Sequence, residues 1–280
     1  MTRHEAFERA VPGYSRGNVL SVPGVWDGLS TTLVEQAGFR CAFLSGGALS
    51  MARHARPDTG LVTMTELVQA LAVIREISDL PLIVDADTGF GNEANTQRTV
   101  RALEAAGATA IQLEDQEFPK RCGFVAGKQV IPAHDFVNKL KAALDARRSE
   151  RTLIIARTDA RAIEGFQAAL DRAARYVEAG ADLLFVEGPE TIGEMMQIGS
   201  QFGDSIPLIH NLVEGGNSPV NGADAMKPLG YTVALHPLLM LHGFIRQAPH
   251  LLGVLKLTGS TASLVAEIGD LKGFGAILKS

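Results

Sequence analysis

The stretch IVDADTGFGN, residues 83–92, joins a buried strand to a glycine turn. The apolar run at 82–84 is typical of a strand that is buried on both faces. Two carboxylates, Asp85 and Asp87, end this strand two residues apart. In extended backbone that spacing places both side chains on one face. Two like charges at the end of a core strand require a physical explanation, which depends on the fold and on the residues at the other strand ends.

Seven further apolar runs resemble this one, and helical patterns separate them. The patterns at 65–77 and 166–180 repeat their apolar residues every three or four positions. Gly38, Gly107 and Gly180 end three such patterns and favour left-handed caps. This alternation predicts a single (β/α)8 barrel over residues 1–280. The predicted strands are Val19–Asp27, Cys41–Gly47, Pro81–Asp87, Ala110–Asp115, Thr152–Asp159, Leu183–Gly188, Pro207–Leu212 and Thr232–Pro237.

Three segments exceed what the barrel itself needs. Residues 1–18 predict a short helix outside it. Residues 238–280 hold more helix than one barrel helix requires, and their last part is apolar. A surplus apolar helix needs a surface to cover, so we expect it to pack on another subunit. Residues 113–130 are long for a strand–helix connection, which is typical of a functional lid.

Composition narrows the class of partner. The chain has 280 residues, of which 46% are hydrophobic, with a net charge of -5 and a pI of about 5.8. These values indicate neither a nucleic acid nor an anionic membrane as partner. Two cysteines suggest no disulfide framework, and the polar N-terminus has no signal core. No apolar run is long enough to span a membrane. We therefore expect a cytoplasmic protein.

The carboxylates at the strand ends predict a metal site. Active sites of barrels of this type lie at the carboxyl ends of the strands. Asp85, Asp87 and Glu114 of the next strand would repel one another there unless a cation lies among them. Oxygen ligands favour Mg²⁺, with Mn²⁺ possible, over zinc. The alternative is that these acids cap helices or pair with Arg98 and Arg157.

Two other strand ends carry groups that suit an acidic substrate. Arg157 can hold a carboxylate through two parallel hydrogen bonds, or it can form an internal salt bridge. Gly46 and Gly47 let a ligand approach their backbone amides, or they form a plain turn. His210, on an apolar strand, is more typical of an interior histidine than of a metal ligand.

Cys122 lies in the long loop, between basic residues. Lys120 and Arg121 beside it favour the thiolate. On a loop over a metal site such a thiol could act as an acid or base. A lone surface cysteine can equally have no role. Cys41 begins a core strand and is expected only to pack.

These residues resemble those of the isocitrate lyase and phosphoenolpyruvate mutase superfamily. The resemblance rests on eight motifs in the family's order. They are SGGALS (45–50), PD (57–58), DADTGFGN (85–92), LEDQ (113–116), KRCG (120–123), ARTDA (156–160), VEG (186–188) and NLVEGGNSP (211–219).

The resemblance implies a Mg²⁺-dependent barrel that binds a 2-oxo or 2-hydroxy carboxylate. It also implies a homotetramer of dimers that exchange a C-terminal helix. By position, the metal residues would be Asp85, Asp87 and Glu114. The catalytic residues would be Cys122, Arg157, Glu114 and Lys120. The substrate-binding residues would be Ser45, Gly46, Gly47, Asp58, Gly123, Phe124, Glu187, Asn211 and Ser218.

Several positions depart from the tricarboxylate-cleaving members of that family. Those members have histidine where this chain has Phe124 and Gln112, tyrosine at His236, and arginine at His242. Phenylalanine cannot pair with a substrate carboxylate. A pocket that loses charge in this way should prefer a substrate with an apolar arm.

The sequence therefore predicts a carbon–carbon lyase. The expected substrate is a small 2-hydroxy acid, such as a substituted malate or a methylisocitrate-like acid. It would be cleaved to a 2-oxo acid and a carboxylate. The alternatives are an oxaloacetate hydrolase or decarboxylase, a phosphonate-type mutase, and a scaffold that binds oxo-acids without turnover.

Overall fold

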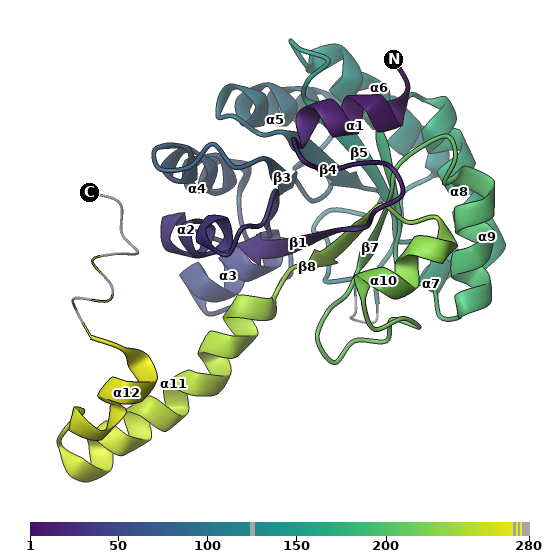
Figure 1. The fold of residues 1–280 in the computed structure, drawn as a ribbon. Coiled ribbons are helices and arrows are strands. Elements are labelled where there is room, and N and C mark those ends of the chain that lie inside the picture. The colour runs from purple at the N-terminus through teal and green to yellow at the C-terminus, as the bar shows by residue number, and fades with distance from the viewer. Residues whose placement is uncertain (124–126, 271–272, 274, 276–280) are drawn as a thin grey trace.

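Eight parallel strands form a closed barrel in chain order (Figure 1). The computed structural model describes residues 1–123, 127–270, 273 and 275. The observed strands confirm all eight predicted ones. They are β1 Leu20–Val25, β2 Ala42–Leu44, β3 Leu82–Asp85, β4 Ala110–Glu114, β5 Leu153–Thr158, β6 Leu183–Val186, β7 Leu208–Asn211 and β8 Val233–His236.

Helices surround the barrel and extend beyond it. The predicted N-terminal helix is present as α1, and the predicted patterns at 65–77 and 166–180 appear as α4 and α8. The α-helices are α1 Arg3–Ala10, α2 Gly28–Gln36, α3 Gly46–His54, α4 Met64–Arg75, α5 Glu93–Ala105, α6 Ala133–Ala146, α7 Arg161–Glu164, α8 Phe166–Glu178, α9 Ile192–Phe202, α10 Ala223–Met226, α11 Leu239–Thr258 and α12 Val265–Ile268. Short 3₁₀ helices are η1 Lys227–Leu229 and η2 Ala262–Leu264.

Two apolar layers hold the barrel together. The inner layer fills the barrel with side chains such as Phe43, Ile83 and Phe185, and Phe7 of α1 belongs to the same cluster. The outer layer packs the alternate side chains of the strands against the helices. Because both strand faces are buried, the strands read as continuous apolar runs in the sequence.

The second strand is shorter than predicted. The sequence placed its end at Gly47, but β2 stops at Leu44 and α3 begins at Gly46. The reason is local: the Ser45 hydroxyl accepts a hydrogen bond from the Ala48 amide at 3.1 Å and caps the helix. Residues 45–47 therefore present a helix N-terminus, rather than a strand end, to the mouth of the barrel.

The predicted glycine caps are confirmed. Gly38, Gly107 and Gly180 have φ angles of 83°, 97° and 106°, and they follow α2, α5 and α8. In this left-handed region a side chain is strained and glycine is not.

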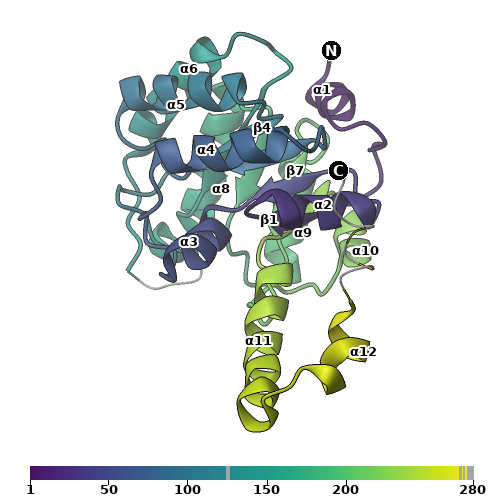
Figure 2. The same cartoon turned by 90° about the vertical axis from the view of Figure 1, so that its left-hand side faces the viewer.

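The C-terminal helices lie outside the barrel. Figures 1 and 2 show α11 projecting from the barrel, with α12 beside its far end. The 20-residue α11 confirms the predicted surplus helix, whereas η2 and α12 are short. Residues 271–272, 274 and 276–280, which include part of the predicted apolar ending, lie outside the described residues. Within the described part of the chain, every helix is too short or too polar to cross a bilayer.

One contact between backbones sets a sharp packing limit. A Cβ on Gly199 of α9 would lie 1.8 Å from the Leu229 carbonyl oxygen of η1. We expect Gly199→Ala to lower the free energy of unfolding by about 1–3 kcal/mol, since backbone must move to admit the methyl group. Gly193→Ala is the control in the same helix, because its nearest atom lies at an ordinary 3.7 Å. Chemical denaturation of both variants tests this, and equal stabilities would contradict it.

Candidate active site

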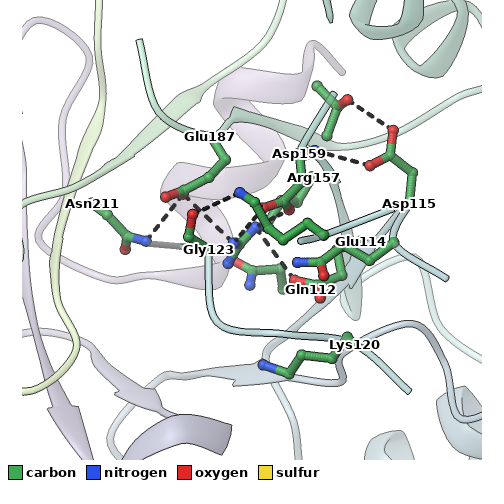
Figure 3. A network of polar contacts seen from close by, with 12 residues as sticks. Gln112, Glu114, Asp115, Lys120, Gly123, Arg157, Asp159, Glu187 and Asn211 are labelled. Carbon is green, nitrogen blue, oxygen red and sulfur yellow. Dashed lines mark hydrogen bonds and ion pairs between the residues drawn. The ribbon is translucent and has the colours of Figure 1, made fainter. Parts of the chain in front are cut away.

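The predicted site residues gather at the carboxyl ends of the strands. A cavity of about 50 Å³ is lined by residues that the sequence analysis named and by apolar residues that it did not. The first group is Ser45, Gly47, Asp58, Asp85, Lys120, Cys122, Gly123, Arg157 and Asn211. Gly46, Asp87, Glu114, Glu187 and Ser218 lie around this cavity or beside its neighbour. Figure 3 shows the polar network that continues from it.

One buried lysine joins two of the acids. Lys120 Nζ lies 2.6 Å from Asp58 Oδ2 and 2.9 Å from Asp87 Oδ1, and its side chain is only 3% exposed. Gln112 donates a hydrogen bond to Asp85 Oδ1 at 3.2 Å, as the pairing of β3 with β4 allows. The sequence analysis named Gln112 only as a departure from the family pattern, and its amide supports a carboxylate here.

Asp85 and Asp87 converge, but not for the predicted reason. The sequence argument assumed extended backbone through both residues. In the structure β3 ends at Asp85, and Asp87 has a φ of 48° in the turn that follows. Both carboxylates nevertheless approach the start of α3. A Cβ on Gly46 would lie 3.3 Å from Asp85 Oδ2 and 3.4 Å from Asp87 Oδ1.

Arg157 is the centre of a second cluster (Figure 3). Its Nε and Nη2 donate to Asp159 at 2.8 and 3.1 Å. Its guanidinium also lies 3.4 Å from Glu114 and 3.7 Å from Glu187. The register of β4 and β5 places Glu114 directly beside Arg157. The predicted internal salt bridges are therefore present, and they orient a guanidinium that also lines the cavity.

Burial dominates the electrostatics of both clusters. It raises the pKa of Asp87 to about 7, although Lys120 opposes the shift. Burial also raises the pKa of Glu114 well above its ordinary value, against the attraction of Arg157. Burial alone would lower the pKa of Lys120, but the surrounding acids outweigh it and raise that pKa.

Carboxylates outnumber cations in this network. Among the described residues, six carboxylates face three cations, which leaves a formal charge of −3 when every carboxylate is ionised. The carboxylates are Asp58, Asp85, Asp87, Glu114, Asp159 and Glu187, and the cations are Lys120, Lys128 and Arg157. Such a surplus in a buried place attracts a further cation.

Unsatisfied oxygens point to the same need. Both carboxylate oxygens of Glu114 and the amide oxygens of Gln112 and Asn211 are buried without a hydrogen bond among the described residues, although Glu114 has its ion pair with Arg157 at 3.4 Å. In that part of the chain, no group of three or more His, Cys, Asp or Glu side chains is arranged so that it could hold a metal ion by itself. Mg²⁺ commonly takes only one or two protein carboxylates and keeps several waters, so the acids present fit such an ion.

Residues 120–123, here called the cysteine loop, bring Gly123 against Arg157. The Cys122 amide donates to the Asp58 carbonyl at 3.0 Å, and Cys122 lines the cavity. Gly123 is packed so closely that a Cβ there would lie 2.6 Å from Arg157 Nη2 and 2.9 Å from Glu187 Oε1. Phe124, the predicted source of the apolar pocket, lies outside the described residues.

A second cavity adjoins the first and shares Gly123 and Asn211 with it. It has a volume of about 150 Å³, and Glu187, Asn211 and Ser218 line it. Asn211 donates to Glu187 Oε2 at 3.3 Å (Figure 3). Ser218 bonds the ring of His210 at 2.8 Å. Burial lowers the pKa of His210 to about 4, as expected of a neutral interior histidine.

Apolar side chains line the rest of the first cavity. The sequence analysis missed these residues because the inward direction of a side chain is not visible in a continuous apolar run. They are Phe43, Met51, Val213, Pro237 and Leu238. Phe43 is the exception, because it lies two residues before Ser45 and residues two apart in a strand face the same side.

Two strand-end acids serve structure instead. Asp27 caps α2 by accepting a hydrogen bond from the Ser30 amide at 2.8 Å. Asp115 accepts hydrogen bonds from Thr158, Tyr176 and the Asp159 amide behind the site. Cys41 is fully buried, and burial raises the pKa of its thiol to about 12, in keeping with a packing role.

A sequence profile named phosphoenolpyruvate phosphomutase matches residues 14–227. The chain belongs to this family. It is 37% identical to 2,3-dimethylmalate lyase of Eubacterium barkeri over 94% of this chain and 92% of that one. It is 39% identical to 2-methylisocitrate lyase of Aeropyrum pernix over 90% of this chain and 80% of that one. Carboxyvinyl-carboxyphosphonate phosphorylmutase of Arabidopsis thaliana is also 39% identical, over 93% of this chain and 77% of its own.

Solved structures of the family superpose closely. Oxaloacetate acetylhydrolase in complex with 3,3-difluorooxalacetate gives a TM-score of 0.89 at 25% identity, over 99% of this chain and 93% of that one. Phosphonopyruvate hydrolase in complex with oxalate and Mg²⁺ gives 0.85 at 26% identity, over 99% and 95%. The predicted superfamily and the barrel are thus confirmed. Lyases, a mutase and hydrolases share them.

The close packing at Gly123 makes a direct prediction. We expect Gly123→Ala to lower turnover about 100-fold, because its methyl group displaces the buried Arg157 guanidinium or the loop that carries Cys122. Thermal stability should change little. Gly222→Ala is the control, since no described atom outside its own neighbourhood lies within 4 Å of a Cβ there. Steady-state kinetics with a melting curve test this, and a fully active Gly123→Ala enzyme would contradict it.

Proposed function

We propose that this protein is a Mg²⁺-dependent carbon–carbon lyase that cleaves a small 2-hydroxy acid with an apolar arm. The products would be a 2-oxo acid and a carboxylate. The observation that carries the proposal is that Cys122 and Arg157 line one small cavity together with Lys120, Asp58 and Asp85. Relatives named as lyases of 2,3-dimethylmalate and 2-methylisocitrate support the reaction class.

The apolar lining supports the choice of substrate. Phe43, Val213 and Leu238 are apolar parts of the cavity lining. A second substrate carboxylate against these side chains would lose hydration without gaining a partner, whereas an alkyl group would be favourably buried. A substituted malate with alkyl groups on its carbon chain suits this cavity better than a tricarboxylate.

The side chains and backbone amides around the cavity suggest the steps of the proposed cleavage reaction. The amide end of α3, at Ser45–Gly47, and the Arg157 guanidinium would hold the carboxylate and oxygen at C2. When a carboxylate of the site takes the proton of the substrate hydroxyl, the C2–C3 bond breaks and its electrons pass to C3. The hydroxyl oxygen becomes the carbonyl of the 2-oxo acid. Cys122 Sγ would then give its proton to C3 of the departing enolate, and Arg157 would stabilise the developing charge.

The predicted metal would be held by Asp85 and Asp87, directly or through water, with Glu114 nearby. When bound, Mg²⁺ would supply Lewis-acid polarisation of the two oxygens at C1 and C2. The solved family structure with oxalate and Mg²⁺ supports an ion in this family. The surplus of carboxylates around Lys120 and Arg157 supports it in this chain.

Metal binding can be measured without turnover. We expect calorimetric titration of the chelator-treated protein with MgCl₂ to show binding, because added positive charge relieves the repulsion among the buried acids. Asp85→Asn should weaken it about 10- to 100-fold. Asp145→Asn, at an exposed position on α6, is the control. Equal affinities for wild type and Asp85→Asn would argue against the assigned ligands.

The reaction is tested by its products. We expect a 2-oxo acid and a carboxylic acid from alkyl-substituted malates, detected by mass spectrometry. Cys122→Ser should lower turnover by at least about 100-fold with the fold intact, since a serine hydroxyl is a far weaker acid. Full activity of Cys122→Ser would show that Cys122 is not the proton donor.

The main rival keeps the same site but acts on a 2-oxo diacid. Its support is the close superposition on oxaloacetate acetylhydrolase. Oxalate and acetate from oxaloacetate, with no cleavage of substituted malates, would select this rival. A phosphonate-forming mutase, as in the Arabidopsis relative, would show a new carbon–phosphorus signal in ³¹P NMR. A scaffold would bind the acids and release no product.

We also propose that copies of the chain associate through the C-terminal helix. Apolar residues of α11 such as Phe244 and Leu252 are 66% and 65% exposed. An apolar groove of about 700 Å³ lies between α3 and α4, lined in part by Trp26, Leu49 and Val73. A second copy of α11 suits this groove, in line with the predicted helix-exchanged tetramer.

Light scattering after size exclusion tests this association. We expect the wild type to be a multimer. Combined Phe244→Glu and Leu252→Glu should shift it toward the monomer, because charge in an apolar interface stays unpaired. Ile192→Glu, at an apolar residue of α9 that is 51% exposed, is the control. A monomeric wild type would refute the proposal. The cytoplasmic location stays a prediction from cysteine content, which cell fractionation would check.

A further inference from the structure

Lys128 is a buried lysine that the proposed reaction does not use, and it connects the backbone beside Cys122 with the cluster around Arg157. Lys128 lies after the cysteine loop, and its side chain is only 5% exposed. Its ammonium donates to the Gly123 carbonyl at 2.6 Å and to Asp159 Oδ1 at 2.9 Å. A buried ammonium is costly unless its donors are satisfied, so this position is held by strong, specific contacts.

Asp159 shares its carboxylate between two cations. Oδ1 accepts from Lys128 and from Arg157 Nη2, while Oδ2 accepts from Arg157 Nε at 2.8 Å. The Asp159 backbone amide is itself held by Asp115 at 2.9 Å. Asp159 is thus a fixed point, and the lysine and the guanidinium are oriented from the same atoms.

The loop backbone returns to the same guanidinium. Gly123, whose carbonyl binds Lys128, lies against Arg157 Nη2 and Glu187 Oε1, with no room for a Cβ. The contacts therefore form a closed circuit from Gly123 to Lys128, Asp159, Arg157 and back to Gly123 (Figure 3 shows Gly123, Arg157 and Asp159). Cys122 precedes Gly123, so the circuit fixes the backbone that carries the thiol.

We propose that Lys128 is a positioning residue that sets the place of the Cys122–Gly123 backbone relative to Arg157. It touches neither substrate nor metal in this assignment. Without its ammonium, the Gly123 carbonyl loses its donor and Asp159 keeps Arg157 as its one cationic partner among the described residues. The guanidinium then stays held, while the thiol-bearing backbone loses its anchor at Gly123 and keeps the bond from the Cys122 amide to the Asp58 carbonyl. The proposal rests on the proposed function only in supposing that the thiol and Arg157 act on one substrate.

The first test reads the thiol without any substrate. In the native protein the buried Cys41 should resist alkylation, so iodoacetamide reports on Cys122. We expect Lys128→Met to change the alkylation rate of Cys122 at least about fivefold, and Lys128→Arg to restore it in part, because arginine keeps charge and donors. Lys141→Met, at an exposed position on α6, should leave the rate unchanged.

The second test reads turnover on whichever acid the wild type cleaves. We expect kcat of Lys128→Met to fall about 10- to 100-fold with KM changed less than threefold, since binding groups stay in place while the proton donor is misplaced. An unchanged alkylation rate in a folded Lys128→Met protein would overturn the proposal. So would a loss of activity that only follows a loss of folded protein. Because alkylation needs no turnover, a wrong substrate assignment would leave this test intact.

Discussion

The surplus of buried carboxylates at the mouth of the barrel is the constraint on which the rest of the site depends. Asp85, Asp87 and Glu114 lie close together, and burial and neighbouring acids both raise the pKa of Asp87 and of Glu114, so nearby positive charge is needed to keep these two groups ionised. Lys120 and Arg157 supply part of that charge from two different elements. The remaining imbalance of charge supports the divalent cation proposed for this site, because the repulsion that opposes folding would be relieved when a cation binds.

The register of the parallel strands determines which charged side chains of neighbouring strands lie beside one another. Asp85 pairs with Gln112, Glu114 pairs with Arg157, and Arg157 pairs with Phe185, whose ring lies 5.0 Å from the guanidinium carbon. Each contact joins residues that are distant in the chain but adjacent around the barrel. The rigid strands therefore hold charged groups in fixed places, while Cys122 reaches the cavity from a loop outside them.

Local backbone geometry completes what the strands begin. The helix start at Ser45–Gly47 and the left-handed Asp87 both come from turns, and Gly123 is pressed against Arg157 and Glu187. Sequence reasoning anticipated all of these residues, but it assigned Ser45–Gly47 and Asp87 to extended strand ends. It failed there because a two-residue spacing specifies one face only if the backbone stays extended, and a capping serine or a positive φ ends that condition.

The sequence by itself determined the barrel, its eight strands, the superfamily and the acids at the strand ends. Those features follow from local periodicity and from short motifs, which are properties of neighbouring residues. Only the tertiary structure decided that Lys120 joins Asp58 to Asp87, that Asp27 and Asp115 serve structure, and that Phe43 and Leu238 line the cavity. It also decided the place of Lys128, whose partners lie 5 and 31 residues away. Contacts of that kind depend on how separate elements meet in space, and no local pattern encodes them.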